Sequence, residues 1–158
     1  MLQPGQPAPD FTLFDSDKQE VTLSSLRGRH VLLLFFPAAF TSVCTAELCS
    51  VRDSLKDFEG MNAYPLGISV DSPFTLARYK AEQELNFPLL SDFNKEVSTT
   101  YGALYENFVF GMKGVSKRAA FVIDPEGILR YVEVLENAGE QPDFTAIRAA
   151  LGETTAAS

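Results

Sequence analysis

The chain has 158 residues, the length of one domain, and with 46% hydrophobic residues it can bury a core without disulfide staples. Its 13 basic and 21 acidic side chains give a net charge of −8, which argues against a nucleic-acid partner. Because we find neither an amino-terminal signal pattern nor an apolar run of about 18 residues, we expect a cytoplasmic protein without a membrane partner.

Strand and helix signals alternate along the chain, which predicts a layered α/β domain over 1–158. We expect strands at 10–14, 20–23, 30–36, 63–70 and 105–110, and a strand pair at 118–134 that folds at 124–127. A further segment at 87–90 precedes a short helix. The expected helices cover 43–59, a stretch from a cap near Ser72 to about Leu85, 94–101 and 143–151. The small polar tail at 152–158 is expected to be frayed.

Cys44 is the most informative residue of the chain. The apolar run at 30–36 predicts a buried strand, and the loop that starts at Pro37 then delivers Cys44 to the first turn of the helix at 43–59. Unpaired amide groups and the positive end of the helix dipole stabilise an anion there, so this position favours a reactive thiolate. The simpler alternative, a small buried hydrophobe, explains the residue type but not its position.

Pro37, Thr41 and Cys44 stand in the spacing P-x-x-x-T-x-x-C, which resembles the active-site motif of the peroxiredoxins, thiol peroxidases on a thioredoxin-like fold. The resemblance implies a central mixed sheet flanked by helices. It extends over almost the whole chain through four further segments, which are 5–11, 66–72, 88–92 and 117–124. Within the family, 35–41 and 105–107 most resemble the AhpE subgroup.

The resemblance assigns a role to each matching residue. Cys44 is similar to the peroxidatic cysteine, whose thiolate attacks a peroxide oxygen and becomes a sulfenic acid. The Thr41 hydroxyl would hydrogen-bond to the peroxide and the sulfur, although it can instead serve only as a helix cap. Pro37 would shield the sulfur from water, or simply end the strand. Arg118 would donate to both thiolate and peroxide, the alternative being a surface ion pair, for which Lys117 is the better candidate.

Glu47 has two interpretations. It can orient Arg118 or another cation, or it can serve only the helix amino terminus as part of a capping box with Thr41 or Ser42.

The implied substrates are hydrogen peroxide and organic hydroperoxides, and the implied reductant is a thioredoxin-like protein or a small thiol. We expect no cofactor and no metal, because two Cys and one His lack zinc-ligand spacing and no phosphate-binding glycine loop is present. The lone His30 is interpreted as structural. The resemblance also implies a homodimer, with Phe40 packing across it. Phe108, Phe110 and Met112 either line a mouth for organic peroxides or belong to the core.

Cys49 decides how the enzyme would be recycled. It follows Cys44 by five residues, which on an intact helix separates the Cα atoms by about 8.6 Å, whereas disulfides rarely span more than about 7 Å. A Cys44–Cys49 disulfide therefore requires the first turn to unwind. Peroxiredoxins of the bacterioferritin-comigratory type have a resolving cysteine at this offset, and familiar AhpE members lack it and use an external thiol. We interpret Cys49 as the resolving cysteine; one-cysteine catalysis is the alternative.

Two other functional classes compete with a peroxidase. A thioredoxin-type exchange protein typically carries C-x-x-C, which is absent here. A redox sensor would use the same sulfenic acid as a signal, and it would react once rather than turn over.

Overall fold

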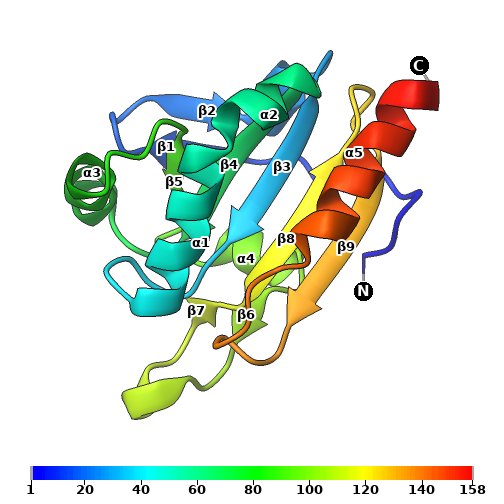
Figure 1. The fold of residues 1–158 in the computed structure, drawn as a ribbon. Helices are drawn as coiled ribbons and strands as arrows, with labels where there is room; N and C mark the ends of the chain where they lie inside the picture. The colour runs from blue at the N-terminus through cyan, green and yellow to red at the C-terminus, as the bar shows by residue number, and fades with distance from the viewer. Residues whose placement is uncertain (1, 158) are drawn as a thin grey trace.

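The computed structural model describes residues 2–157, with side chains up to residue 152. Its centre is a mixed seven-stranded sheet in the order β2-β1-β5-β4-β3-β8-β9 (Figure 1). The strands β3, β4 and β5 run parallel to one another and the remaining pairs are antiparallel. The sheet consists of β1 (Thr12–Asp15), β2 (Glu20–Thr22), β3 (His30–Phe35), β4 (Ala63–Ser69), β5 (Leu89–Ser91), β8 (Arg118–Ile123) and β9 (Leu129–Leu135).

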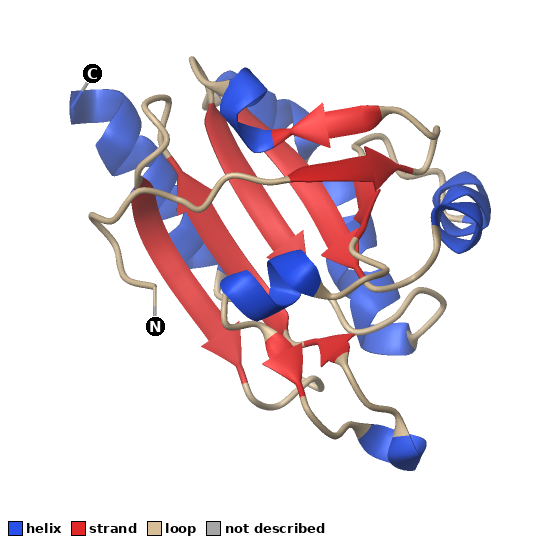
Figure 2. Cartoon of the chain, turned by 180° about the vertical axis from the view of Figure 1, so that it is seen from behind, coloured by secondary structure: helices blue, strands red, loops and turns tan. Residues whose placement is uncertain are grey.

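Helices cover both faces of the sheet, as expected. On the face toward the viewer of Figure 1 lie α1 (Ser42–Asp53), α2 (Leu55–Gly60) and α5 (Phe144–Ala157). The reverse view shows the short α4 (Glu96–Thr100) over the opposite face (Figure 2). Beside β5 lies α3 (Pro73–Glu82), whose amino terminus is capped by Ser72, as predicted.

The central strand β3 is buried on both faces, as its continuous apolar sequence predicts. Successive side chains point to opposite faces, so Leu32 and Leu34 pack with α1 and α5. Leu33 and Phe35 pack in the second core, together with Tyr101.

The register of β3 and β8 creates the setting of the candidate site. Phe35, the last residue of β3, pairs with Ala119 in antiparallel β8. Arg118, the first residue of β8, therefore lies at the carboxyl end of β3, where the chain leaves toward Cys44. Residues 74 positions apart in the sequence meet at one edge of the sheet.

Three predicted elements differ from the structure. The helix predicted at 43–59 is two helices, α1 and α2, which join at the non-helical Ser54, because Asp53 and Ser54 are weak helix formers. The predicted strand at 105–110 is wrong: only β6 (Leu104–Tyr105) is strand, paired with β7 (Val115–Ser116).

The residues after β6 form a short 3-10 turn (Val109–Gly111) with Phe110 in the left-handed region, a conformation that cannot continue a strand. The helix α3 ends at Glu82, before Leu85, because Glu84 also has a positive φ. The helix α5 runs to Ala157. Because the side chains from 153 onward and residue 158 lie outside the described residues, the frayed tail stays a prediction.

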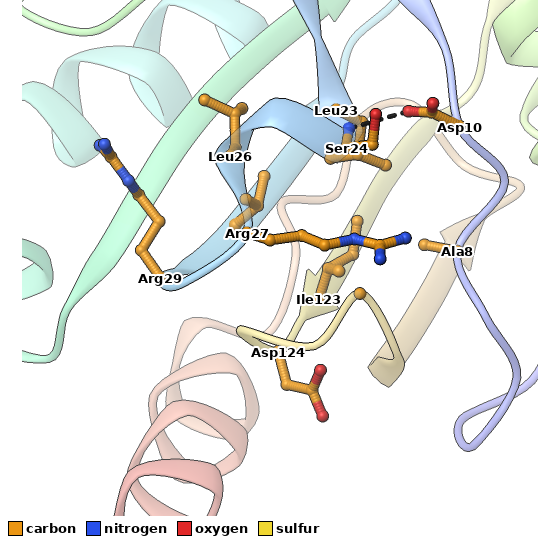
Figure 3. A pocket seen from close by; sticks show the side chains of 11 residues that line it. Ala8, Asp10, Leu23, Ser24, Leu26, Arg27, Arg29, Ile123 and Asp124 are labelled. Atoms are coloured by element: carbon orange, nitrogen blue, oxygen red, sulfur yellow. Dashed lines mark hydrogen bonds between the residues drawn. The ribbon is translucent and has the colours of Figure 1, made fainter.

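A small hollow lies at the opposite end of β3 and β8 from Arg118, beside Val31 and Ile123 (Figure 3). The Asp10 carboxylate closes one side by accepting a hydrogen bond of 2.8 Å from the Ser24 amide. Its volume of about 20 Å³ holds no more than about one water molecule. The hollow is therefore a packing gap rather than a substrate site.

His30 is buried at the start of β3, and neither ring nitrogen has a hydrogen-bond partner among the described residues. Burial lowers its pKa below the usual 6.5, so the folded state prefers the neutral ring. That contribution to stability is present above about pH 6.5 and is lost as the pH falls toward the folded-state value.

We predict that His30→Leu removes this acid sensitivity. Relative to the parent, the free energy of unfolding of the variant should rise by up to about 1.4 kcal/mol for each pH unit below about 6.5. Denaturant unfolding of both proteins between about pH 7.5 and pH 5.5 measures the difference. Parallel pH profiles would show that His30 accepts a proton in the folded protein without cost.

Candidate active site

Cys44 lies in the first turn of α1, only 1% exposed. The loop that leads to it starts at Pro37, which is buried at the end of β3. Asp71, which follows β4, fixes this loop, since its Oδ2 accepts from the Ala39 amide at 2.8 Å and from the Ser69 hydroxyl at 2.7 Å. The loop from β3 to α1 is thus fixed to the carboxyl end of β4, and this holds the thiol in one position.

Arg118 is the residue that joins the parts of the site. Its Nη2 lies 3.1 Å from Cys44 Sγ, and its Nη1 donates to Glu47 Oε1 at 2.7 Å. Nε and Nη2 both donate to the Ala138 carbonyl, at 3.2 Å and 2.9 Å. Burial by itself would lower the pKa of Arg118, but Cys44 and Glu47 outweigh burial and raise it. The guanidinium therefore stays charged beside the sulfur.

Glu47 is fully buried one turn after Cys44. Burial raises the pKa of its carboxyl to about 7, and the nearby Arg118 guanidinium opposes that shift. Oε2 has no hydrogen-bond partner in the described part of the chain. The predicted pairing with Arg118 is confirmed, and the capping box is wrong, because the carboxylate faces the arginine rather than the helix amino terminus.

Thr41 is the residue before the first turn of α1, but its side chain caps no amide of the helix. Instead, its hydroxyl donates to the Ala38 carbonyl at 2.8 Å, so a plain capping role is also wrong. The hydroxyl keeps lone pairs that can accept a further hydrogen bond. Because the Thr41 side chain makes no hydrogen bond to the amides of the first turn, these amides stay available to an anion.

Lys117 was predicted to make the surface ion pair next to Arg118, and this is confirmed by its 2.6 Å contact with the exposed Glu136. Arg118 itself has turned inward. Lys117 lies between β7 and β8 and its side chain reaches Glu136 at the surface, whereas the side chain of Arg118, the first residue of β8, is buried in the site.

Cys49 is a partly buried free thiol on the same helix as Cys44, which is also free. It lies at the edge of the core face of α1, and its Sγ is 3.6 Å from Gln83 Oε1, just after α3. The helix between the two cysteines is continuous, so they cannot be bonded in this conformation.

Three contributions were not found from the sequence. The Ala138 carbonyl has no side-chain signature, because it acts through the backbone. Asp71 lies in a segment that supports the family resemblance, which was the available signal. Tyr79 of α3, whose hydroxyl lies 2.8 Å from Thr45 Oγ1, reads in the sequence as an ordinary core aromatic.

The predicted apolar mouth lies in the loop between β6 and β7, at the end of the sheet where α1 begins (Figure 1). Phe108 stacks on Tyr105 at 4.9 Å between ring centroids. Phe110 is 97% exposed and Met112 is partly exposed, so core packing is wrong for both. A role in admitting peroxides stays a prediction.

Among the described side chains, which run to residue 152, no group of three or more His, Cys, Asp or Glu is arranged to hold a metal ion. Within residues 2–157, no helix has the length and apolar character needed to span a bilayer.

Comparison with known proteins gives consistent matches. The model of the AhpC/TSA family matches residues 4–132. Alkyl hydroperoxide reductase E of Mycobacterium tuberculosis is 42% identical over 159 residues, which cover 99% of this chain and 100% of that protein. Peroxiredoxin-2 of Rattus norvegicus is 39% identical over 140 residues, or 82% of this chain and 68% of the relative.

Solved structures of similar proteins have the same fold. Peroxidoxin BcpB from Mycobacterium tuberculosis superimposes with a TM-score of 0.82 at 31% identity, covering 99% of this chain and 98% of the other. A peroxiredoxin-like protein from Aquifex aeolicus gives a TM-score of 0.86 at 25% identity, covering 97% and 88%.

The raised pKa of Glu47 predicts a second, opposite pH effect on stability. The neutral carboxyl stabilises the fold fully below about pH 4.5, and this contribution is lost as the pH rises through about 7. Glu47→Gln is a neutral isostere that can still accept from Arg118. The free energy of unfolding of Glu47→Gln, relative to that of the parent, should therefore increase as the pH rises from about 5 to about 8. A constant difference across this range would mean that the parent carboxyl does not titrate there.

Proposed function

This chain belongs to the AhpC/TSA family and is a peroxiredoxin, a thiol-dependent peroxidase, and on that premise we propose that Cys44 is the thiol that attacks the peroxide. The observation that carries this proposal is the 3.1 Å contact between Cys44 Sγ and the buried Arg118 guanidinium. A charged donor at this distance makes a strong hydrogen bond to a sulfur that carries negative charge. The hydrogen-bond partner that the structure gives Cys49 Sγ is the neutral side-chain amide of Gln83.

In the proposed first step the Cys44 thiolate attacks the terminal oxygen of the hydroperoxide. An S–O bond forms, the O–O bond breaks, and the alkoxide or hydroxide leaves as an alcohol or water after taking a proton from solvent. Cys44 is oxidised to a sulfenic acid and the peroxide is reduced. Because negative charge grows on the leaving oxygen, donors directed there should supply most of the rate.

Arg118 and the first-turn amides of α1 are the proposed donors. Thr41 is proposed to accept from the peroxide O–H, which would orient its oxygens, since the Thr41 hydroxyl already donates to Ala38. Pro37 would exclude water from the buried sulfur, and Glu47 would hold Arg118 in position through Nη1.

We further propose hydrogen peroxide and organic hydroperoxides as substrates, the apolar residues Phe108, Phe110 and Met112 supporting the second class. A thioredoxin-like protein or a small thiol would return the electrons. Two free cysteines suit the cytoplasm, a compartment that keeps thiols reduced. A homodimer is supported by Phe40, a half-exposed residue of the active-site loop.

For the second step, we propose that Cys49 resolves the sulfenic acid. The Cys49 sulfur attacks Cys44, the S–S bond forms, and the S–O bond breaks with release of water. Because about 8.6 Å separates Cα atoms five residues apart on a helix, the first turn of α1 would have to unwind. In the alternative, an external thiol attacks the sulfenic acid directly and α1 stays helical.

The two mechanisms differ in mass after one equivalent of hydrogen peroxide without reductant. We predict that the parent loses two hydrogens, as a disulfide requires, and that Cys49→Ser instead gains one oxygen. Intact-protein mass spectrometry distinguishes these products. If both proteins gain one oxygen, Cys49 is a bystander and an external thiol completes the cycle.

The role of Arg118 predicts that Arg118→Lys lowers the second-order rate with hydrogen peroxide by roughly 10²–10³-fold, the usual cost of a donor to the developing charge. Lysine keeps the charge but cannot donate to Cys44, Glu47 and Ala138 together. Stopped-flow kinetics measures the rate.

The matched control is Lys117→Ala, which removes the neighbouring charge that pairs with Glu136 and should change the rate by less than about two-fold. Equal rates for Arg118→Lys and the parent would remove Arg118 from the mechanism.

A further inference from the structure

The first turn of α1 is held by a helix that contributes nothing to the chemistry. Two residues four positions apart, Tyr79 in α3 and Gln83 directly after it, lie on the same side of that segment and both contact α1. They reach different parts of α1, however, and this difference determines which part can move.

Tyr79 holds the residues on both sides of Cys44. Its fully buried hydroxyl lies 2.8 Å from Oγ1 of Thr45, the residue directly after Cys44. Its ring also packs edge-to-face against Phe40, with 5.0 Å between the ring centroids. Burial raises the pKa of Tyr79 to about 12, so the phenol stays a neutral hydrogen-bonding group at physiological pH.

Gln83 holds the later turns. Its carbonyl accepts from Arg52 Nη1 at 2.6 Å, and its side chain faces Cys49 Sγ. Asn86 adds a hydrogen bond of 3.3 Å to the Arg52 carbonyl. The end of α1 is therefore fixed by several contacts, including one to its backbone, whereas the first turn has one side-chain hydrogen bond to α3.

The loop before α1 also stores backbone strain. Phe40 adopts φ +67°, a left-handed conformation that is unfavourable for a residue with a bulky side chain. The ring contact between Phe40 and Tyr79 stabilises this conformation in the folded state. When the Tyr79 contacts to Phe40 and Thr45 are broken, the loop and the first turn of α1 can relax together.

We propose that Tyr79 is a positioning residue that latches the first turn of α1 and so sets how oxidised Cys44 is divided between the disulfide with Cys49 and further oxidation. This inference rests on the proposed resolving role of Cys49. With the latch closed, the sulfenic acid stays beside Arg118, where a second hydrogen peroxide can oxidise it to a sulfinic acid with release of water. With the latch open, Cys44 moves to Cys49, which is held in place by the later turns.

Tyr79→Phe tests the latch, because it removes the hydroxyl and keeps the ring against Phe40. Losing one hydrogen bond should open the first turn about five-fold more often. Two readouts follow: in the reduced protein, amides 45–48 should exchange with deuterium about five-fold faster while amides 50–53 keep the parent rate. After excess hydrogen peroxide, the ratio of disulfide to sulfinic acid should rise by a similar factor.

Three further variants distinguish loss of this hydrogen bond from a general loss of structure. Thr45→Val removes the same hydrogen bond from the other side, and the double variant with Tyr79→Phe should show no additional effect. Tyr101→Phe is the matched control, since Tyr101 is also a buried tyrosine whose hydroxyl donates, in its case to the Pro9 carbonyl, away from α1. It should leave both readouts at the parent value.

Parent-like exchange of amides 45–48 in Tyr79→Phe overturns the latch, and so does equal acceleration along the whole of α1. If the exchange changes as expected but the parent forms no disulfide, the resolving role of Cys49 fails while the latch stands. If the disulfide forms but its ratio to sulfinic acid is insensitive to Tyr79→Phe, the latch does not control resolution.

Discussion

Arg118 carries a positive charge into a region that solvent hardly reaches, and such a charge is tolerated only where acceptors surround it. The acceptors come from distant parts of the chain: Cys44 and Glu47 from α1, and the carbonyl of Ala138 from the loop after β9. Any rearrangement that removes one of them leaves a buried guanidinium partly unpaired. The site is therefore rigid, because moving any of these groups breaks a hydrogen bond to a buried charge.

This constraint places opposite requirements on the first turn of α1. For the first chemical step, Cys44 must stay in contact with Arg118. For a disulfide with Cys49, Cys44 must move away from Arg118, since both cysteines lie on one continuous helix. Oxidation to a sulfenic acid replaces the thiolate with a weaker partner for Arg118, and the hydrogen bonds from Arg118 to Glu47 and Ala138 do not depend on Cys44. The departure of Cys44 then costs less than it would in the reduced enzyme.

The sequence predicted the parts of the site that depend on local chain geometry. The apolar run of β3, the loop from Pro37 and the helix start together predict an activated Cys44, and the inward-facing Arg118 followed from the family pattern. The contact of Arg118 with the Ala138 carbonyl could not be predicted, because a backbone acceptor can belong to any residue type. The hydrophobic pattern also does not show the helix break at Ser54, which depends on weak helix formers, or the path of the loop after β6, which depends on the left-handed Phe110.

The central claim is that Cys44, and not Cys49, is the nucleophile. Because the chain has only two cysteines, Cys49→Ser and Cys44→Ser each leave a single thiol. The direct measurement is the consumption of one equivalent of hydrogen peroxide by each variant without reductant. Cys49→Ser should consume it at the parent rate, and Cys44→Ser should consume none on that timescale. Consumption by Cys44→Ser at the parent rate would contradict the claim and make Cys49 the reactive residue.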